Sequence, residues 1–286
     1  MKPAPFEYHR PASLLETFDL LERYGDDGRI LAGGQSLVPA LNMRLATPRA
    51  VIDINRLPGL DAIRLASEGL VIGALARHEA VERSPLVREH APLLALAMPH
   101  VGHEAIRTRG TVGGSLALAD PAAELPACAV ALDATIRVEG RRGRRGVAAA
   151  DFFRGIYTTA LEPGELVTEL VVPPAPGWRS DFQELARRHG DFALAGLAAR
   201  ARVERDGIAE ARLVLFGVGP APVRAHRAER ALAGRRVDAD VVAAAQRALA
   251  AELDPPGDVH GSPALRRHLA GVLLSRVITR LAEARA

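Results

Sequence analysis

The chain has 286 residues, of which 48% are hydrophobic and 25% are charged, a composition typical of a globular protein with room for two domains. The formal net charge is only +3, and the arginines are spread along the chain, so nothing indicates nucleic-acid binding. Lys2 is the only lysine, which excludes a phosphate loop ending in Gly-Lys-Ser/Thr and, unless Lys2 itself reacts, a Schiff base to pyridoxal phosphate.

The start of the chain predicts a small α/β unit. Residues 1–11 contain no apolar stretch of signal-peptide length, and no run approaches the ~18 apolar residues of a membrane span, so we expect a cytoplasmic protein without a transmembrane segment. Ser13 and Glu16 form a capping box that opens an amphipathic helix over 13–24. A strand over 29–32, a helix over 36–45 and a strand over 50–54 follow.

A glycine pair separates the first strand from its helix. At Gly33 and Gly34, backbone N–H groups can converge on an anion, and the helix N-terminus adds a favourable dipole. Gln35 and Ser36 add an amide and a hydroxyl, so the turn predicts a phosphate or pyrophosphate site. The pattern G-x-G-x-x-G is absent, and Val38 breaks the nucleophile-elbow pattern G-x-S-x-G. A purely structural turn is the alternative.

The next region leads to a second glycine pair. Residues 63–74 predict a hairpin, and 77–98 predict short helices interrupted at Pro85 and Pro92. Within 106–126, the stretch from Thr111 to Ser115 is interpreted as a second cradle facing the first across a long ligand. The alternatives are a bulged strand at a barrel corner and a degenerate nucleophile elbow at Ser115.

A helix over 122–132 is expected after this pair, with Asp120 as N-cap and Pro121 at its first position. Glu124 in its first turn could accept hydrogen bonds from a ribose, or could be a surface carboxylate that stabilises the helix dipole. Cys128 is expected to be buried on this helix. As the only cysteine, it permits neither an internal disulfide nor an iron–sulfur cluster held by this chain alone, and we expect no metal site.

The remaining sequence predicts a boundary and a second domain. Strands are expected over 135–139 and 165–172, and the arginine-rich run 141–146 is interpreted as a solvated hairpin turn or, alternatively, as a basic docking patch. The segment 173–178, PPAPGW, is the expected linker. Strands over 182–188, 193–204 and 208–218, with a hairpin turn at Asp206-Gly207, precede helices over 238–253 and 264–284, the latter capped by Ser262 with Pro263 at its first position.

Three stretches together resemble a known family: AGGQSL at 32–37, IRTRGTVGGSLALADPAAELP at 106–126, and ELARRHGDFALAG at 184–196. They resemble the FAD subunit of molybdenum hydroxylases, the medium chain of the carbon monoxide dehydrogenase type, which is similar to the flavin domain of xanthine dehydrogenase. The resemblance covers almost the whole chain. It implies an α+β protein with a two-subdomain FAD-binding domain of the vanillyl-alcohol-oxidase/PCMH type over 1–176. A C-terminal domain over 177–286, with an antiparallel three-stranded sheet and helices, would follow.

The resemblance also implies the cofactor contacts. The two glycine turns would bracket the FAD diphosphate, which places it against Ala32, Gly33, Gly34, Gln35, Ser36 and Leu37 and against Thr111, Gly113, Gly114 and Ser115. Glu124 would hold the adenosine ribose, Leu161 and Val167 would border the isoalloxazine, and Phe192 would lie at the domain interface against the ring. Relatives often carry a lysine about where Glu184 stands, so the charge near the flavin departs from the family pattern here.

The implied function is electron transfer. FAD would take electrons from iron–sulfur clusters and pass them to a quinone, NAD or oxygen, and no residue of this chain is assigned as catalytic. The expected partners are a large molybdopterin subunit and a small subunit with [2Fe-2S] clusters, in a dimer of heterotrimers. The alternatives are a stand-alone nucleotide-binding or regulatory module without redox turnover, and a hydrolase that uses Ser115.

Overall fold

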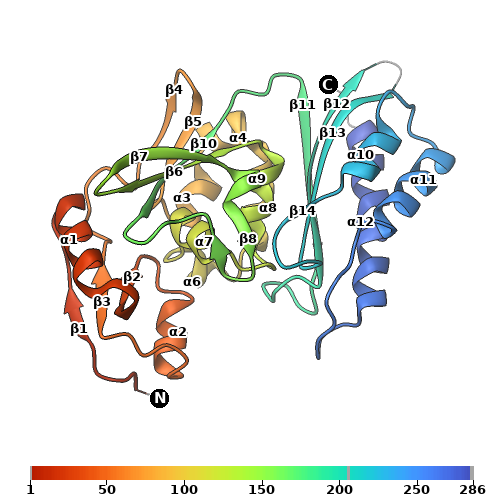
Figure 1. The fold of residues 1–286 in the computed structure, drawn as a ribbon. Coiled ribbons are helices and arrows are strands. Elements are labelled where there is room, and N and C mark those ends of the chain that lie inside the picture. The colour runs from red at the N-terminus through yellow and green to blue at the C-terminus, as the bar shows by residue number, and fades with distance from the viewer. Residues whose placement is uncertain (1, 205–206, 284–286) are drawn as a thin grey trace.

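The computed structural model describes residues 2–204 and 207–283. Three α/β units follow one another across the molecule, with the N-terminal unit on the left of Figure 1, a larger central unit and the C-terminal domain on the right. They are built on sheets of three, five and four strands. This mixture of sheets and helices confirms the expected α+β class.

The N-terminal unit is a parallel sheet in the order β1-β3-β2. The predicted capping box is present, because Ser13 Oγ accepts from the Glu16 N–H at 3.2 Å, although the Glu16 carboxylate accepts from the N–H of Ala12 rather than of Ser13. Helix α2 is shorter than predicted, since the chain turns at Arg44 with φ 58°. The elements are β1 (Glu7–His9), α1 (Leu14–Tyr24), β2 (Gly28–Leu31), α2 (Leu37–Asn42) and β3 (Ala50–Asp53).

The central unit has an antiparallel sheet in the order β4-β5-β10-β6-β7, with an accompanying ribbon of β8 and β9. The predicted hairpin and the helices broken at Pro85 and Pro92 are confirmed. The elements are β4 (Ile63–Ala66), β5 (Gly69–Gly73), α3 (His78–Arg83), α4 (Pro85–His90), α5 (Pro92–Ala97), α6 (Glu104–Arg107), α7 (Val112–Leu118), α8 (Glu124–Ala131), β6 (Thr135–Gly140), β7 (Gly143–Ala148), α9 (Ala149–Phe152), β8 (Phe153–Gly155), β9 (Thr158–Thr159) and β10 (Leu166–Val172).

Two local predictions around the second glycine pair are corrected. The pair lies in helix α7 with Thr111 as its N-cap, so a bulged strand at this place is wrong. Asp120 does not cap α8, because its Oδ1 accepts from the Ala122 N–H at 2.9 Å in a separate turn, and the helix begins only at Glu124. Cys128 is buried on α8, as predicted.

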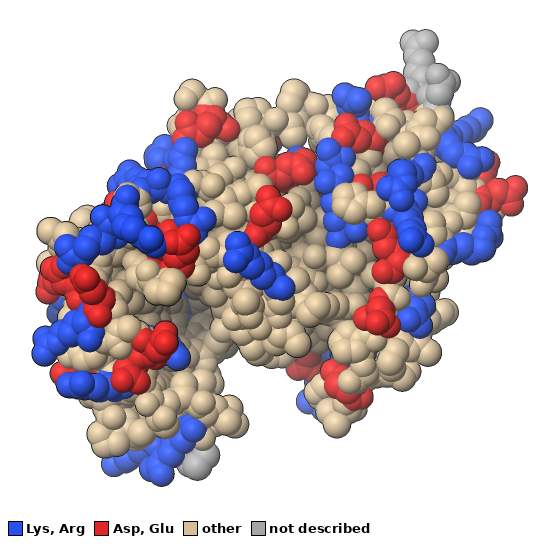
Figure 2. All heavy atoms as spheres, viewed as in Figure 1, with Lys and Arg blue, Asp and Glu red and all other residues tan. Residues whose placement is uncertain are grey.

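The arginine-rich run is only in part a turn. Arg141 and Arg142 connect the strands, while Gly143 already begins β7. Acidic side chains pair with its arginines. Blue and red spheres are intermixed on the upper left of Figure 2. The pairs are Arg141 with Asp19 and Glu22, Arg142 with Glu162, Arg144 with Glu139, and Arg145 with Glu165. This compensation does not support a basic docking patch.

The C-terminal domain has an antiparallel sheet in the order β11-β12-β13-β14, one strand more than the three predicted. The short β14 and helix α10 were missed. Ser262 accepts from the Leu265 N–H in the first turn of α12, as predicted, and Asp238, predicted as the first residue of a helix, is the N-cap of α11. Of the predicted hairpin turn, Asp206 lies outside the described residues, and Gly207 begins β13. The elements are β11 (Trp178–Leu185), β12 (Ala195–Glu204), β13 (Gly207–Phe216), β14 (Val223–Arg224), α10 (His226–Leu232), α11 (Ala239–Ala250) and α12 (Pro263–Glu283).

Both faces of the C-terminal sheet are covered. Phe182, Ala198, Val214 and Phe216 belong to the same hydrophobic core as helices α5 and α8 of the central unit. The opposite face packs against α10, α11 and α12 in a second core. The sheet is therefore fixed against the central unit by buried apolar surface, which is the dominant stabilising term in such contacts.

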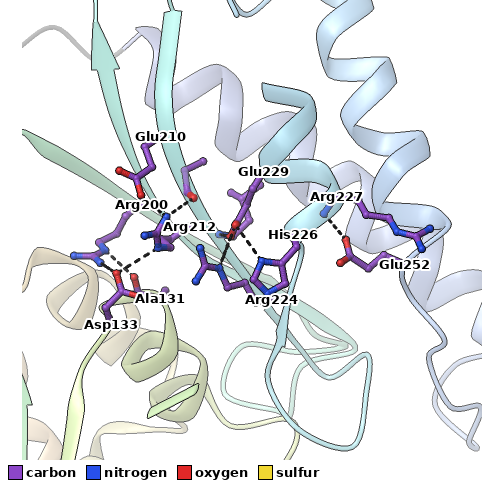
Figure 3. A network of polar contacts seen from close by, with 12 residues as sticks. Ala131, Asp133, Arg200, Glu210, Arg212, Arg224, His226, Arg227, Glu229 and Glu252 are labelled. Carbon is purple, nitrogen blue, oxygen red and sulfur yellow. Dashed lines mark hydrogen bonds and ion pairs between the residues drawn. The ribbon is translucent and has the colours of Figure 1, made fainter. Parts of the chain in front are cut away.

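A polar contact adds to this packing (Figure 3). The Asp133 carboxylate, after α8, accepts from Arg200 at 3.0 Å and from Arg212 at 3.3 Å, two residues of the C-terminal sheet. Arg200 is buried, and its Nε also donates to the Ala131 carbonyl at 2.7 Å. The Trp178 ring faces both guanidinium groups, 4.8 Å and 5.4 Å from their carbons. Asp133 thus compensates a buried cation across the junction.

No helix among the residues that the structure describes is both long enough and apolar enough to cross a membrane.

Replacing Asp133 by asparagine should lower the free energy of unfolding by about 1–3 kcal/mol, because the buried Arg200 cation loses its charged partner. Asparagine keeps the side-chain size and tolerates the left-handed backbone at this position, where φ is 50°. Urea denaturation measures the change. The control Glu210→Gln removes a half-exposed partner of Arg212 and should cost less than about 1 kcal/mol. Equal midpoints for the two variants would contradict the prediction.

Candidate functional site

The two glycine turns that the sequence singled out lie against each other. A Cβ atom on Gly33 would stand 2.5 Å from the carbonyl oxygen of Arg109 and 2.9 Å from the Cα of Gly110. A Cβ on Gly114 would stand 3.9 Å from the Cβ of Ala32. The loop after β2 and the loop before α7 are therefore in van der Waals contact, at the junction of the N-terminal and central units.

The first turn presents free donors. Gly34 has φ 75°, which glycine adopts without strain, and the chain enters α2 directly afterwards with the Val38 N–H donating to the Gly34 carbonyl at 2.9 Å. Within the described chain, the N–H groups of residues 33–36 donate to no backbone or side-chain acceptor. Consecutive free N–H groups before a helix form an anion-binding arrangement.

The second turn is built differently. The N–H of Val112 donates to the Ala76 carbonyl at 3.1 Å, and that of Gly113 to the Ala74 carbonyl at 2.7 Å. The Thr111 hydroxyl accepts from the Gly114 N–H at 3.2 Å. Gly113 is buried, with no room for a Cβ against Ala74, whereas Gly114 and Ser115 remain partly exposed. This turn therefore presents a surface without a side chain at Gly114 and the hydroxyl of Ser115. Its backbone N–H groups are used within the protein, where they hold α7 in place.

Ser115 is not placed as a nucleophile. It lies inside α7, one turn after the Thr111 cap, and not at a sharp bend between a strand and a helix. Among the described residues, its hydroxyl has no hydrogen bond to a histidine that could act as a base. The geometry gives no support to the hydrolase alternative.

Two polar side chains that the sequence analysis did not single out, those of Asn55 and Arg77, connect the turns. Asn55 Nδ2 donates to the Ala32 carbonyl at 2.8 Å, and Arg77 Nη2 donates to Asn55 Oδ1 at 2.7 Å. Arg77 Nη1 donates to the Arg109 carbonyl. Only Asn55 could have been found from the sequence. It follows the strand β3, and the carboxyl ends of neighbouring parallel strands such as β2 and β3 meet at one edge of the sheet.

Two buried carboxyl groups lie where the central unit meets the C-terminal sheet. Glu124 is only 9% exposed, so the alternative of a surface carboxylate is wrong. Burial raises the pKa of Glu124 to about 8, and the nearby carboxylates of Glu184 and Asp120 add to the shift. The Glu184 side chain is 5% exposed, with Oε1 3.5 Å from His100 Nδ1 and no partner for Oε2 in the described chain.

The remaining predicted residues lie in different environments. Val167 on β10 is buried in the central core, and Leu161 is partly buried against the same core. Phe192, between β11 and β12, is 73% exposed. Tyr157, at the tip of the β8–β9 ribbon, is also exposed, and its hydroxyl is 3.3 Å from Asp120 Oδ2.

The space-filling view shows a broad hollow along the lower edge of the molecule (Figure 2). The N-terminal lobe, which carries α2, borders it on the left, and the C-terminal domain borders it on the right. Helix α2, which directly follows the first glycine turn, thus lies on the lobe that borders this hollow.

Comparisons with known protein families agree across the chain. Residues 4–175 match the model described as the FAD binding domain in molybdopterin dehydrogenase. Residues 180–281 match the model described as the CO dehydrogenase flavoprotein C-terminal domain.

Individual relatives match over nearly their whole length. The chain is 40% identical to the caffeine dehydrogenase subunit beta of a Pseudomonas species, covering 99% of this chain and 97% of the relative. It is 38% identical to the 6-hydroxypseudooxynicotine dehydrogenase complex subunit alpha of Paenarthrobacter nicotinovorans, covering 98% and 95%. A solved structure of carbon monoxide dehydrogenase from Hydrogenophaga pseudoflava, lacking the Mo-pyranopterin moiety, superimposes with a TM-score of 0.95 at 38% identity, covering 98% of both chains.

The raised pKa of Glu124 predicts a pH-dependent stability. Between about pH 4.5 and pH 8 the folded chain keeps a proton that the unfolded chain releases, so stability falls as the pH rises through this range. Glu124→Gln is neutral at every pH, and in the ligand-free chain it should add about 1–3 kcal/mol at pH 7.5 and little near pH 4.5. Urea denaturation across this range tests it, with the exposed Glu89→Gln as control. A stability difference that does not change with pH would contradict the assignment.

Proposed function

The chain belongs to the family of FAD-binding medium subunits of molybdenum hydroxylases, and from this membership we propose that it passes electrons from iron–sulfur clusters of a partner subunit through FAD to an external acceptor. When bound, FAD supplies chemistry in one-electron and two-electron steps. The acceptor would be a quinone, NAD or oxygen. The chain itself binds and orients the cofactor.

The observation that carries this proposal is the pair of apposed glycine turns. Four consecutive free N–H groups at residues 33–36 suit the negative charge of a diphosphate, and Gly114 opposes them without a side chain. We propose that Ala32, Gly33, Gly34, Gln35, Ser36 and Leu37 hold the diphosphate on one side. Thr111, Gly113, Gly114 and Ser115 would form the other side, with Gly113 and Thr111 acting through the position of α7.

Other proposed contacts extend from this point. The buried Glu124 carboxyl, protonated over much of the neutral range, is able to donate a hydrogen bond to a ribose hydroxyl as well as to accept one. Leu161 and Val167 would supply apolar surface to the isoalloxazine, with Glu184 facing it from the C-terminal sheet. Phe192 is exposed in this structure, and its ring would lie against the isoalloxazine.

We propose that the substrate pocket lies on a partner chain. Relatives named for caffeine and for 6-hydroxypseudooxynicotine match this chain at 40% and 38% identity over 99% and 98% of its length. Chains of this type are therefore similar in sequence although their complexes are named for different substrates. A large molybdopterin subunit and a small subunit with [2Fe-2S] clusters, in a dimer of heterotrimers, would complete the enzyme. In this chain, an FAD-binding domain would extend to residue 176 and a C-terminal domain from 177 to 286.

The chain expressed alone should bind FAD and show a flavin absorption spectrum, but it should not oxidise the substrate of the complex. Its single cysteine, Cys128, is buried on α8 and cannot hold a cluster that would deliver electrons. Adding the partner subunits should restore turnover. Full turnover by the isolated chain, without other subunits or metals, would refute the electron-transfer assignment.

Gly34→Val should abolish FAD binding. A Cβ at this position needs a strained left-handed backbone and would lie 3.1 Å from Leu31 Cδ1 and Val38 Cγ2, which moves the N–H groups of the turn. The flavin-to-protein absorbance ratio measures the loss. Gly59→Val is the matched control, because Gly59 has a similar φ of 78° but open space for a side chain. Normal flavin content in a folded Gly34→Val protein would place the diphosphate elsewhere.

A further inference from the structure

Arg77 joins the two halves of the diphosphate site without being part of either glycine turn. It precedes α3, and its backbone forms an antiparallel bridge with Thr111, the cap of α7. Its side chain reaches in the other direction, toward the N-terminal unit, and donates to Asn55. The residue is therefore fixed to the central unit by its backbone and to the N-terminal unit by its guanidinium.

The guanidinium holds two acceptors that border the site. Nη2 donates to Asn55 Oδ1 at 2.7 Å, and Nη1 donates to the carbonyl of Arg109. That carbonyl is the atom against which Gly33 packs, 2.5 Å from where a Cβ would be. The planar guanidinium of Arg77, which donates to both acceptors, thus sets the distance between the first turn and the loop that leads into the second.

Asn55 is itself held by hydrogen bonds, so the position of the Arg77 guanidinium determines where the first turn lies. Its Nδ2 donates to the Ala32 carbonyl at 2.8 Å and to Asp53 Oδ1 at 2.7 Å, and its backbone N–H donates to the same Asp53 oxygen at 3.0 Å. The Tyr8 hydroxyl donates to the other Asp53 oxygen. Asn55 therefore connects Arg77 to the residue immediately before Gly33.

Arg77 is also a partly buried cation that forms no ion pair among the described residues. Burial and the neighbouring Arg109 cation lower the pKa of Arg77, while the carboxylates of Asp53 and Asp61 raise it. Only neutral acceptors, an amide and a carbonyl, bind its guanidinium. A desolvated positive charge beside the free N–H groups at 33–36 favours a multiply charged anion there.

We propose that Arg77 is a positioning residue for the diphosphate of FAD, which spaces the two glycine turns through Asn55 and the Arg109 carbonyl. This rests on the proposed function, because it takes the turns to be the FAD site. Since Arg77 acts on the diphosphate site alone, its loss affects ligands that carry a diphosphate and spares those that lack one.

The test compares three ligands on the full chain after removal of FAD. Arg77→Met should weaken binding of both FAD and ADP about 10-fold or more, through loss of two hydrogen bonds from a charged donor, and leave riboflavin binding unchanged. Arg77→Lys keeps the charge but cannot donate to both acceptors with one planar group, so it should weaken FAD and ADP binding less. This variant replaces Arg77→Met in the test if the methionine variant does not fold. Arg83→Met, which removes an exposed arginine at the end of α3, is the control.

A double-mutant cycle with Asn55→Leu tests the path of the effect. If Arg77 acts through Asn55, adding Arg77→Met to Asn55→Leu should weaken FAD binding much less than it does in the wild-type chain. The proposal would be overturned if the two substitutions weakened FAD binding additively, or if Arg77→Met weakened riboflavin binding as much as FAD binding. Arg77 would then only stabilise the fold in general. Wild-type FAD binding by Arg77→Met, with binding lost in Gly34→Val, would also overturn it and leave the proposed function intact. Retention of FAD by Gly34→Val would instead refute the proposed site.

Discussion

The proposed nucleotide site depends on a contact that leaves no space for a side chain at Gly33. Because the Arg109 carbonyl lies 2.5 Å from where a Cβ would stand, the first turn is pressed against the loop before α7. Parallel pairing of β2 and β3 brings Ala32 and Asn55 to the same edge, and Asn55 then meets Arg77. The apposed turns, the free donors between them and the polar link behind them all follow from this one close approach of two backbones.

Two turns with similar sequences contribute in different ways because their surroundings differ. The donors at 33–36 stay free, since no strand end or capping side chain of the described chain reaches them. The donors of the second turn are used by the carbonyls of Ala74 and Ala76, directly after β5, which hold α7 to the central sheet. The N–H groups of a glycine pair thus stay free or help to fix a helix, depending on whether carbonyl groups lie within reach.

Local rules predicted the elements whose signals are local. The Ser13 cap, the breaks at Pro85 and Pro92, and the glycine turns all depend on residues within a few positions of one another. Helix α10 was missed because its cap position is Ala225, which carries no capping side chain, and β14 was missed because it has two residues. The link from Asn55 through Arg77 to Arg109 spans 54 positions of sequence, and no periodicity or motif indicates it.

The burial of Glu124 and Glu184 shows why the proposed site needs both domains. Glu124 begins α8, which packs against β12 and β13, and it is buried with the Glu184 carboxylate of the C-terminal sheet close enough to raise its pKa. The sheet covers this end of the central core with Phe182 and Phe216, and brings in a second carboxyl group, Glu184, whose Oε2 has no partner in the described chain. Two acidic groups in a shared apolar core oppose folding, so packing alone does not explain them. A ligand that hydrogen-bonds to carboxyl groups there would remove part of that cost, and the two domains, joined by residues 173–177, would then contribute to one site.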